Sequence, residues 1–168
     1  MPDRSLIPSA WKLQNEYAAL LYLYRGDPEL AYGRVAAAEA LRAEQRVASV
    51  FRPAILRGAV QVERGSPTDA LASLREGLAP ETGGSLSWRP YGLCLLTEAL
   101  LSLGNYVEAL PALSEAFEHI EATGERTWLA ELHRLRGLVL LAQNRLDEGA
   151  ASLTQAIHVA QAQQAKSL

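Results

Sequence analysis

Apolar residues recur along the chain at the three- and four-residue spacing of amphipathic helices, and four short breaks interrupt the pattern. The breaks fall at Gly26, Gly65, Gly104 and Asn144, which lie 39, 39 and 40 residues apart. Glycine and asparagine tolerate the left-handed conformation that ends many helices, so we call these four positions the turn residues. The pattern predicts four helix pairs, with first helices at 9–25, 49–64, 87–103 and 126–143 and second helices at 28–45, 67–79, 106–122 and 146–164.

The residues after the breaks are suited to starting a helix. Asp27, Ser66 and Asn105 are good N-cap residues, and proline follows the first two of them at the first helical position. Asn105 with Glu108 resembles a capping box. Each break therefore predicts a tight turn after which the second helix folds back on the first.

Small residues occupy the same places in all four pairs. Counted from each turn residue, they stand seven before it, five after it and twelve after it. An apolar residue stands nine after it, on the same helix face as the two small residues that follow the turn. These small residues predict close approach of the paired helices, and they are Ala19, Gly58, Thr97 and Gly137, then Ala31, Ala70, Ala109 and Gly149, then Ala38, Gly77, Ala116 and Ala156.

This spacing of small and apolar residues resembles the tetratricopeptide repeat. The resemblance implies an all-α fold, a right-handed α-solenoid of about four antiparallel helix pairs forming one domain over residues 1–168. The expected units are about 9–45, 49–79, 87–122 and 126–164. The period is about five residues longer than the usual 34, and a HEAT-like helical repeat stays open as an alternative.

The last unit has a narrower resemblance. The stretch TGERTWLAELHRLRGLVLLAQNRLDEGAASLTQAI and the AKSL that ends the chain are similar to longer repeats in large bacterial signalling proteins. Those proteins couple a nucleotide-binding ATPase module to a cyclase or to a DNA-binding output domain. The resemblance implies a regulatory or docking role, either in a stand-alone relative or in a piece of such a protein.

Composition narrows the class of protein. The 168 residues are 49% hydrophobic with a formal net charge of −3, and no apolar run is long enough to cross a membrane. The charge gives no basic surface for nucleic acid. The start of the chain has no apolar segment of signal-peptide length, and Cys94 is the single cysteine. We expect a cytoplasmic protein that contacts neither nucleic acid nor membrane.

Catalytic motifs are absent from the sequence. It contains no phosphate-binding glycine loop, no dinucleotide fingerprint, no H-E-x-x-H and no G-x-S-x-G. We therefore expect no enzyme activity, no cofactor and no metal. Glu118, His119 and Glu121 are interpreted as a solvated helix end rather than a metal or acid–base site, His133 as part of a surface charge network, and Cys94 as a buried apolar residue.

One bulky ring opens each predicted first helix, at Trp11, Phe51, Trp88 and Trp128. Packing between adjacent units is the favoured interpretation, and an aromatic edge of a binding surface is the alternative.

In the tetratricopeptide family, partners contact the first helices along the concave groove. Transferred position by position, the resemblance implies a groove made by Glu16, Tyr24, Arg52, Glu63, Tyr91, Glu98, Ser102, Glu131 and Arg134. Their mixed charge differs from the basic carboxylate clamp of the chaperone-binding members.

The sequence thus favours a non-catalytic module that binds a protein or peptide. The alternative is a regulatory domain that senses a small molecule or signal peptide, which a deep pocket under Tyr91 and Arg134 would favour. A second expectation concerns the last unit, where an uncovered apolar face predicts self-association, most simply as a two-fold homodimer. That face is expected to contain Leu138, Leu141, Ala150 and Ile157.

Overall fold

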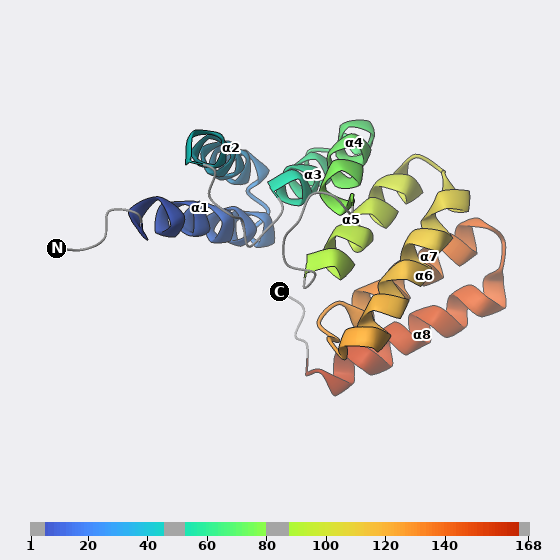
Figure 1. The fold of residues 1–168 in the computed structure, drawn as a ribbon. Coiled ribbons are helices and arrows are strands. Elements are labelled where there is room, and N and C mark those ends of the chain that lie inside the picture. The colour runs from blue at the N-terminus through green and yellow to red at the C-terminus, as the bar shows by residue number, and fades with distance from the viewer. Residues whose placement is uncertain (1–5, 46–52, 80–87, 165–168) are drawn as a thin grey trace. The chain divides into compact units, whose positions relative to one another are not determined.

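A computed structural model describes residues 6–45, 53–79 and 88–164 of the chain, and these residues form helices joined by short turns (Figure 1). The described ranges contain no strand, which confirms the all-α prediction. The eight helices found there are α1 (Leu6–Tyr24), α2 (Pro28–Gln45), α3 (Pro53–Glu63), α4 (Pro67–Leu78), α5 (Arg89–Ser102), α6 (Tyr106–Thr123), α7 (Leu129–Ala142) and α8 (Leu146–Ala162).

The helix ends agree with the predicted ones to within a few residues. The second helices begin at the predicted places, with Pro28 and Pro67 as the first residues of α2 and α4. The first helices differ more, because α1 begins three residues earlier and α7 three residues later than expected. The predicted start at 49, Phe51, Arg52 and most of the 79–87 connection lie outside the described residues.

All four turn residues have the left-handed conformation that the sequence predicts. Their φ values are 73°, 70° and 70° at the three glycines and 62° at Asn144. Two backbone hydrogen bonds close each turn: the turn residue donates to the carbonyl three residues back, and the next residue donates to the carbonyl five residues back, as Asp27 does to Tyr22 at 2.8 Å. This double closure is the Schellman motif, so the same device ends α1, α3, α5 and α7.

The N-caps after the turns differ in chemistry. The Asn105 side chain accepts a hydrogen bond from the Glu108 N–H and donates one to the Glu108 carboxylate, at 3.4 and 2.8 Å. This exchange resembles a capping box and satisfies a free N–H at the start of α6. Ser66 is the N-cap of α4, but its side chain makes no capping hydrogen bond.

The helices of a hairpin touch at the predicted small residues. A Cβ added to Gly58 would lie 2.5 Å from Cγ of Leu74, and one added to Gly137 would lie 2.6 Å from Cγ of Leu153. In both hairpins the leucine nine residues after the turn therefore packs on the glycine seven before it. Gly77 approaches the backbone itself, because its added Cβ would lie 2.9 Å from the Ile55 nitrogen.

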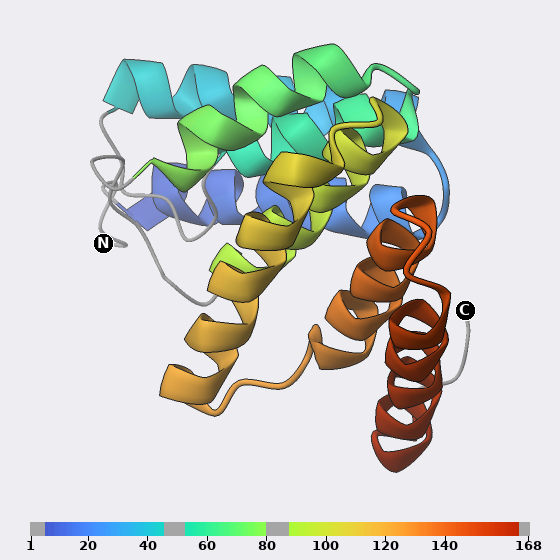
Figure 2. The same cartoon turned by 90° about the vertical axis from the view of Figure 1, so that its right-hand side faces the viewer.

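The chain divides into two compact units, Met1–Leu86 and Ser87–Leu168. In the first unit α3 packs against both α1 and α2, and in the second α7 packs against both α5 and α6. Figure 2 shows α7 and α8 side by side, joined by the turn at Asn144. Both units thus stack one hairpin on another in the same way, while the single-domain solenoid over 1–168 stays a prediction.

The face of α3 and α7 that meets the preceding hairpin can be identified by position. Leu56 and Val60 lie two residues on either side of Gly58, so they point away from α4. Both are at most 1% exposed, and Leu135 and Val139, which flank Gly137 in the same way, are fully buried. These two positions, nine and five residues before the turn, therefore carry the contact between hairpins.

The described residues include no helix that is both long enough and apolar enough to cross a membrane.

The glycine contact in α7 gives a direct test of the hairpin packing. We expect Gly137→Ala to lower the free energy of unfolding by ~1–3 kcal/mol, because its Cβ would overlap Leu153. The matched control is Gly33→Ala, since Gly33 lies within α2 with nothing near its missing Cβ. That change should raise stability by about 0.5–1 kcal/mol through helix propensity. Urea unfolding of both variants measures the difference, and equal effects at the two sites would contradict the assigned contact.

Candidate interaction surface

Three of the residues predicted to line the groove come together in the second unit, and they are Glu98, Glu131 and Arg134. Arg134 donates to both oxygens of Glu131 at 2.8 and 2.5 Å, and to Glu98 of α5 at 3.1 Å. The ion pairs join α5 to α7, and hydrogen bonding to Glu131 is the main reason that the pKa of Arg134 is raised. Two carboxylates thus face one guanidinium.

Aromatic rings lie at the N-terminal ends of the same two helices. Tyr91 stacks on Trp128 with ring centroids 4.6 Å apart, and Trp88 meets Tyr91 edge-on at 6.0 Å. Trp88 and Trp128 are the N-cap residues of α5 and α7, and all three rings are half-buried. The Tyr91–Trp128 pair joins adjacent hairpins, which agrees with the predicted packing role, but the rings keep exposed edges.

The ion pairs and the rings form one continuous surface. Tyr91 and Glu98 are seven residues apart and so share a face of α5. We define the α5–α7 face by six partly exposed residues, which are Trp88, Tyr91, Glu98, Trp128, Glu131 and Arg134.

Cys94 lies close to this surface but is not part of it. The thiol is buried, as the sequence predicts, and burial is the main cause of a pKa well above its usual value. The Glu131 and Glu98 carboxylates raise this pKa further, and Arg134 partly opposes them. A thiol in this state is a poor nucleophile.

The other predicted groove residues are placed differently. Ser102 is exposed, and its hydroxyl donates to the Glu98 carbonyl within α5. Tyr24 and Glu63 are exposed in the first unit. Arg52 lies outside the described residues.

Glu16 is buried, with 1% of its surface exposed, so its carboxylate does not lie on an open groove. The position ten residues before the turn explains why, because it is also buried as Ile55 in α3 and as Cys94 in α5. At that position only Arg134, with its long side chain in the last hairpin, extends to the surface. The repeat register placed Glu16 on the groove, and it does not show that this position is buried.

The residues predicted to mediate self-association differ in exposure. Ala150 and Ile157 are exposed on α8, and Ile157 is 58% exposed. Leu138 is half-buried on α7. Leu141 packs on Gly149 of its own hairpin, since a Cβ added there would lie 2.7 Å from Leu141 Cγ.

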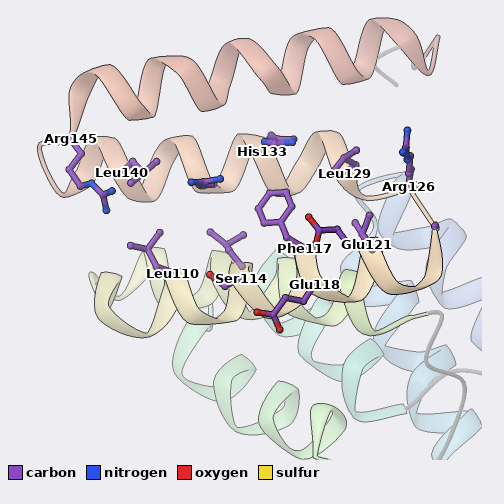
Figure 3. A pocket seen from close by; sticks show the side chains of 14 residues that line it. Leu110, Ser114, Phe117, Glu118, Glu121, Arg126, Leu129, His133, Leu140 and Arg145 are labelled. Atoms are coloured by element: carbon purple, nitrogen blue, oxygen red, sulfur yellow. The ribbon is translucent and has the colours of Figure 1, made fainter.

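A cleft of about 910 Å³ lies between α6 and α7, on residues that the groove prediction does not include. Phe117 of α6 points toward His133 of α7, with ring centroids 5.0 Å apart (Figure 3). Arg126 and Arg145 lie at opposite ends of the cleft. Neither Tyr91 nor Arg134 lines it, so it is not the pocket proposed for a ligand sensor.

Arg136, which also lines the cleft, differs from its counterpart in the first unit. Arg57 and Arg136 both stand eight residues before a turn residue. Arg57 contacts the carboxylates of Glu39 and Glu76 at 2.5 Å each. Arg136 instead lies 5.9 Å from the ring of Phe117, and Phe117 has the position in the second unit that Glu39 has in the first. Arg136 forms no ion pair with any described carboxylate. Comparing these positions between repeats is the sequence signal that would have revealed the cleft.

The helix end with Glu118, His119 and Glu121 provides two residues of the cleft wall, the two glutamates. Within the described ranges, no group of three His, Cys, Asp or Glu side chains is placed to hold a metal ion.

Comparison with known proteins gives one informative relative. An uncharacterized protein of Rhizobium meliloti (strain 1021) is 36% identical to this chain over 86 residues. The matched segment is 51% of this chain but 8% of that protein, so the chain spans a small part of the relative's length. No protein-family model and no solved structure matches the chain.

The surroundings of His133 predict a pH dependence of stability. Burial, and secondarily Arg136, lower the pKa of His133 below 6.5. As the pH falls through 6.5, the unfolded chain therefore takes up a proton at this position before the folded chain does, and the free energy of unfolding decreases. We expect His133→Gln to remove this decrease and Arg136→Gln to remove the smaller part of it. Urea unfolding between about pH 5 and about pH 8 tests this, and an unchanged pH profile in His133→Gln would contradict it.

Proposed function

We propose that this protein is a non-catalytic interaction module that binds a protein or peptide segment through the α5–α7 face. Its architecture in this proposal is a tetratricopeptide-like solenoid formed as one domain by the four hairpins. The recurrence of the same turn, the same small-residue contact and the same stacking in both units supports that architecture.

The ion cluster beside the half-buried rings is the observation that carries the proposal. Tyr91 and Trp128 offer the exposed edges of two stacked rings, and aromatic residues are favoured at binding hot spots. Beside the rings, the Glu131 carboxylate is an acceptor for a cationic group of the peptide. The chemistry fits a peptide with an apolar anchor residue and a lysine or arginine.

The spacing of the two parts restricts the peptide further. Tyr91 and Glu98 are seven residues apart, which is about 10 Å along a helix. An extended chain covers that distance in about three residues. We therefore expect the basic residue about three positions from the apolar anchor.

The setting we propose is a large bacterial signalling protein or its cytoplasmic partner, in which any catalytic step belongs to other domains. The bacterial relative supports this setting, because the matched segment is a small part of a much longer chain. The similarity of the last unit to repeats of signalling proteins supports it independently.

A selected peptide provides the test. We expect peptides of about twelve residues, selected from a random phage library on the wild-type protein, to carry the anchor and the basic residue. Trp128→Ala should weaken their binding at least about tenfold through loss of the ring contact, and Glu131→Gln should weaken it by a smaller factor. Fluorescence anisotropy with a labelled peptide measures both.

Trp11→Ala is the matched control, because Trp11 is exposed on α1 in the other unit. It should leave the affinity unchanged. Melting curves separate lost binding from lost folding in each variant. Peptides that bind Trp128→Ala as well as the wild type would move the binding surface away from the α5–α7 face.

The α6–α7 cleft favours a second candidate function, the sensing of a small anionic ligand. Its volume lies within the range of small-molecule sites, and its wall combines Phe117 with an arginine that has no ion pair among the described residues. A bound ligand would contact α6 and α7 together and so connect two hairpins.

An aromatic sulfonate dye is a suitable probe for this second function. We expect 8-anilinonaphthalene-1-sulfonate to bind the folded protein and Arg136→Gln to weaken that binding about tenfold, since it removes the cation beside Phe117. Arg57→Gln is the matched control, because Arg57 has the same place in the repeat but already contacts two carboxylates. Equal dye affinity in the two variants would exclude the cleft as an anion site.

A further inference from the structure

The outer face of the first hairpin carries residues that the other hairpins use for stacking. Tyr17 and Leu21 stand nine and five residues before Gly26, the positions at which the second and fourth hairpins pack on the hairpin before them. In those hairpins the equivalent residues are at most 1% exposed, whereas Tyr17 is 48% and Leu21 64% exposed. Hairpin α1–α2 thus carries exposed side chains at both stacking positions.

The fourth hairpin carries the opposite half of the same contact. In the first unit Arg57 of α3 contacts Glu39 of α2, and in the second Arg136 of α7 meets Phe117 of α6. The receiving residue is thirteen after the turn in both cases, and in the fourth hairpin that position is Ile157, which is 58% exposed. The incoming residue is eight before the turn, which in the first hairpin is Ala18. Ala18 and Ile157 would form an apolar contact at the place where the first unit has an ion pair and the second unit has a cation over a ring.

A second pair of positions gives charge complementarity. Arg64, one residue before its turn, forms an ion pair with Glu29 and lies over the Tyr32 ring at 4.4 Å. The equivalent residues at the two ends of the chain are Arg25, in the first hairpin, and Asp147, in the fourth. Arg25 is exposed and contacts only Asp27 at 3.5 Å among the described residues, and Asp147 is exposed. If another hairpin stacked in the same way on the α7–α8 hairpin, the Arg25 guanidinium of the first hairpin would therefore meet the Asp147 carboxylate.

We propose that a second copy of this chain stacks head to tail on the first, with the α1–α2 hairpin of one copy covering the outer face of the α7–α8 hairpin of the other. The contact repeats the hairpin-on-hairpin interface found within each unit. Leu21 and Tyr17 are buried against the partner, Ala18 meets Ile157, and Arg25 meets Asp147. Because the two surfaces are different, association continues in one direction rather than closing as a two-fold dimer.

The arrangement differs from a two-fold dimer through the fourth hairpin, and two variants distinguish them. Leu21→Glu removes the head surface only, and Ile157→Glu removes the tail surface only. Each variant alone should be monomeric between about 10 and about 200 µM, where the wild type associates with increasing concentration. An equimolar mixture of the two should form a complex of two chains and no larger species, because each copy keeps the surface that the other lacks. Sedimentation velocity measures all four samples.

Charge reversal gives an independent readout. Arg25→Glu and Asp147→Arg should each weaken association about tenfold, and the double variant should recover most of the loss because the pair is restored with its charges exchanged. The matched control is Val107→Glu, an exposed apolar residue at the first turn of α6, which should associate like the wild type.

The outcomes separate cleanly. A wild type that stays monomeric to about 200 µM overturns the proposal and leaves the α1–α2 face to a flanking segment of a longer protein. A Leu21→Glu variant that still forms dimers supports the two-fold arrangement instead. Thermal melting of each variant, with an unchanged midpoint expected at these exposed sites, ensures that lost association is not lost folding.

Discussion

The close approach of two helices at a glycine or alanine is the contact on which the rest of the structure depends. Where Leu74 packs on Gly58, and Leu153 on Gly137, no space is left for a larger side chain, and the two helices of the hairpin lie close together. The residues two positions to either side of the glycine then point to the opposite side of the first helix, where they form the next contact. A small residue in one place thus fixes both the hairpin and the surface on which hairpins stack.

The sequence was sufficient to predict the eight helices because local chemistry determines their ends. Three glycines and an asparagine terminate the first helices through backbone hydrogen bonds, and this does not depend on tertiary context. The prediction was least accurate at the starts of first helices such as α7, where Trp128 is the N-cap without a capping side chain. No local sequence signal specifies such a start. The packing of the Trp128 ring on Tyr91 positions the start of α7 instead.

Prediction of the candidate surface was partial for a different reason. Tyr91, Glu98, Glu131 and Arg134 were found because the repeat register places them on one side of two neighbouring first helices. The same register placed Glu16 there, but burial at that position is set by the helix opposite, as Ile55 and Cys94 show. A periodic pattern identifies which residues share a helix face. How far that face is buried depends on side chains that are distant in the sequence.

Contacts between hairpins are the part of the molecule that the repeat does not determine. The position eight before the turn is arginine in both α3 and α7, yet it meets glutamates in one unit and a phenylalanine in the other. The backbone geometry is the same in both units, but the side chains that meet between hairpins differ. Each stacking surface therefore matches its own neighbour. Arg57 forms two ion pairs, whereas Arg136 at the equivalent position forms none with a described carboxylate. Such a residue therefore marks a surface where a contact found in the first unit is missing from the second. Such differences between equivalent positions give each stacking surface a chemistry of its own, on which binding specificity depends.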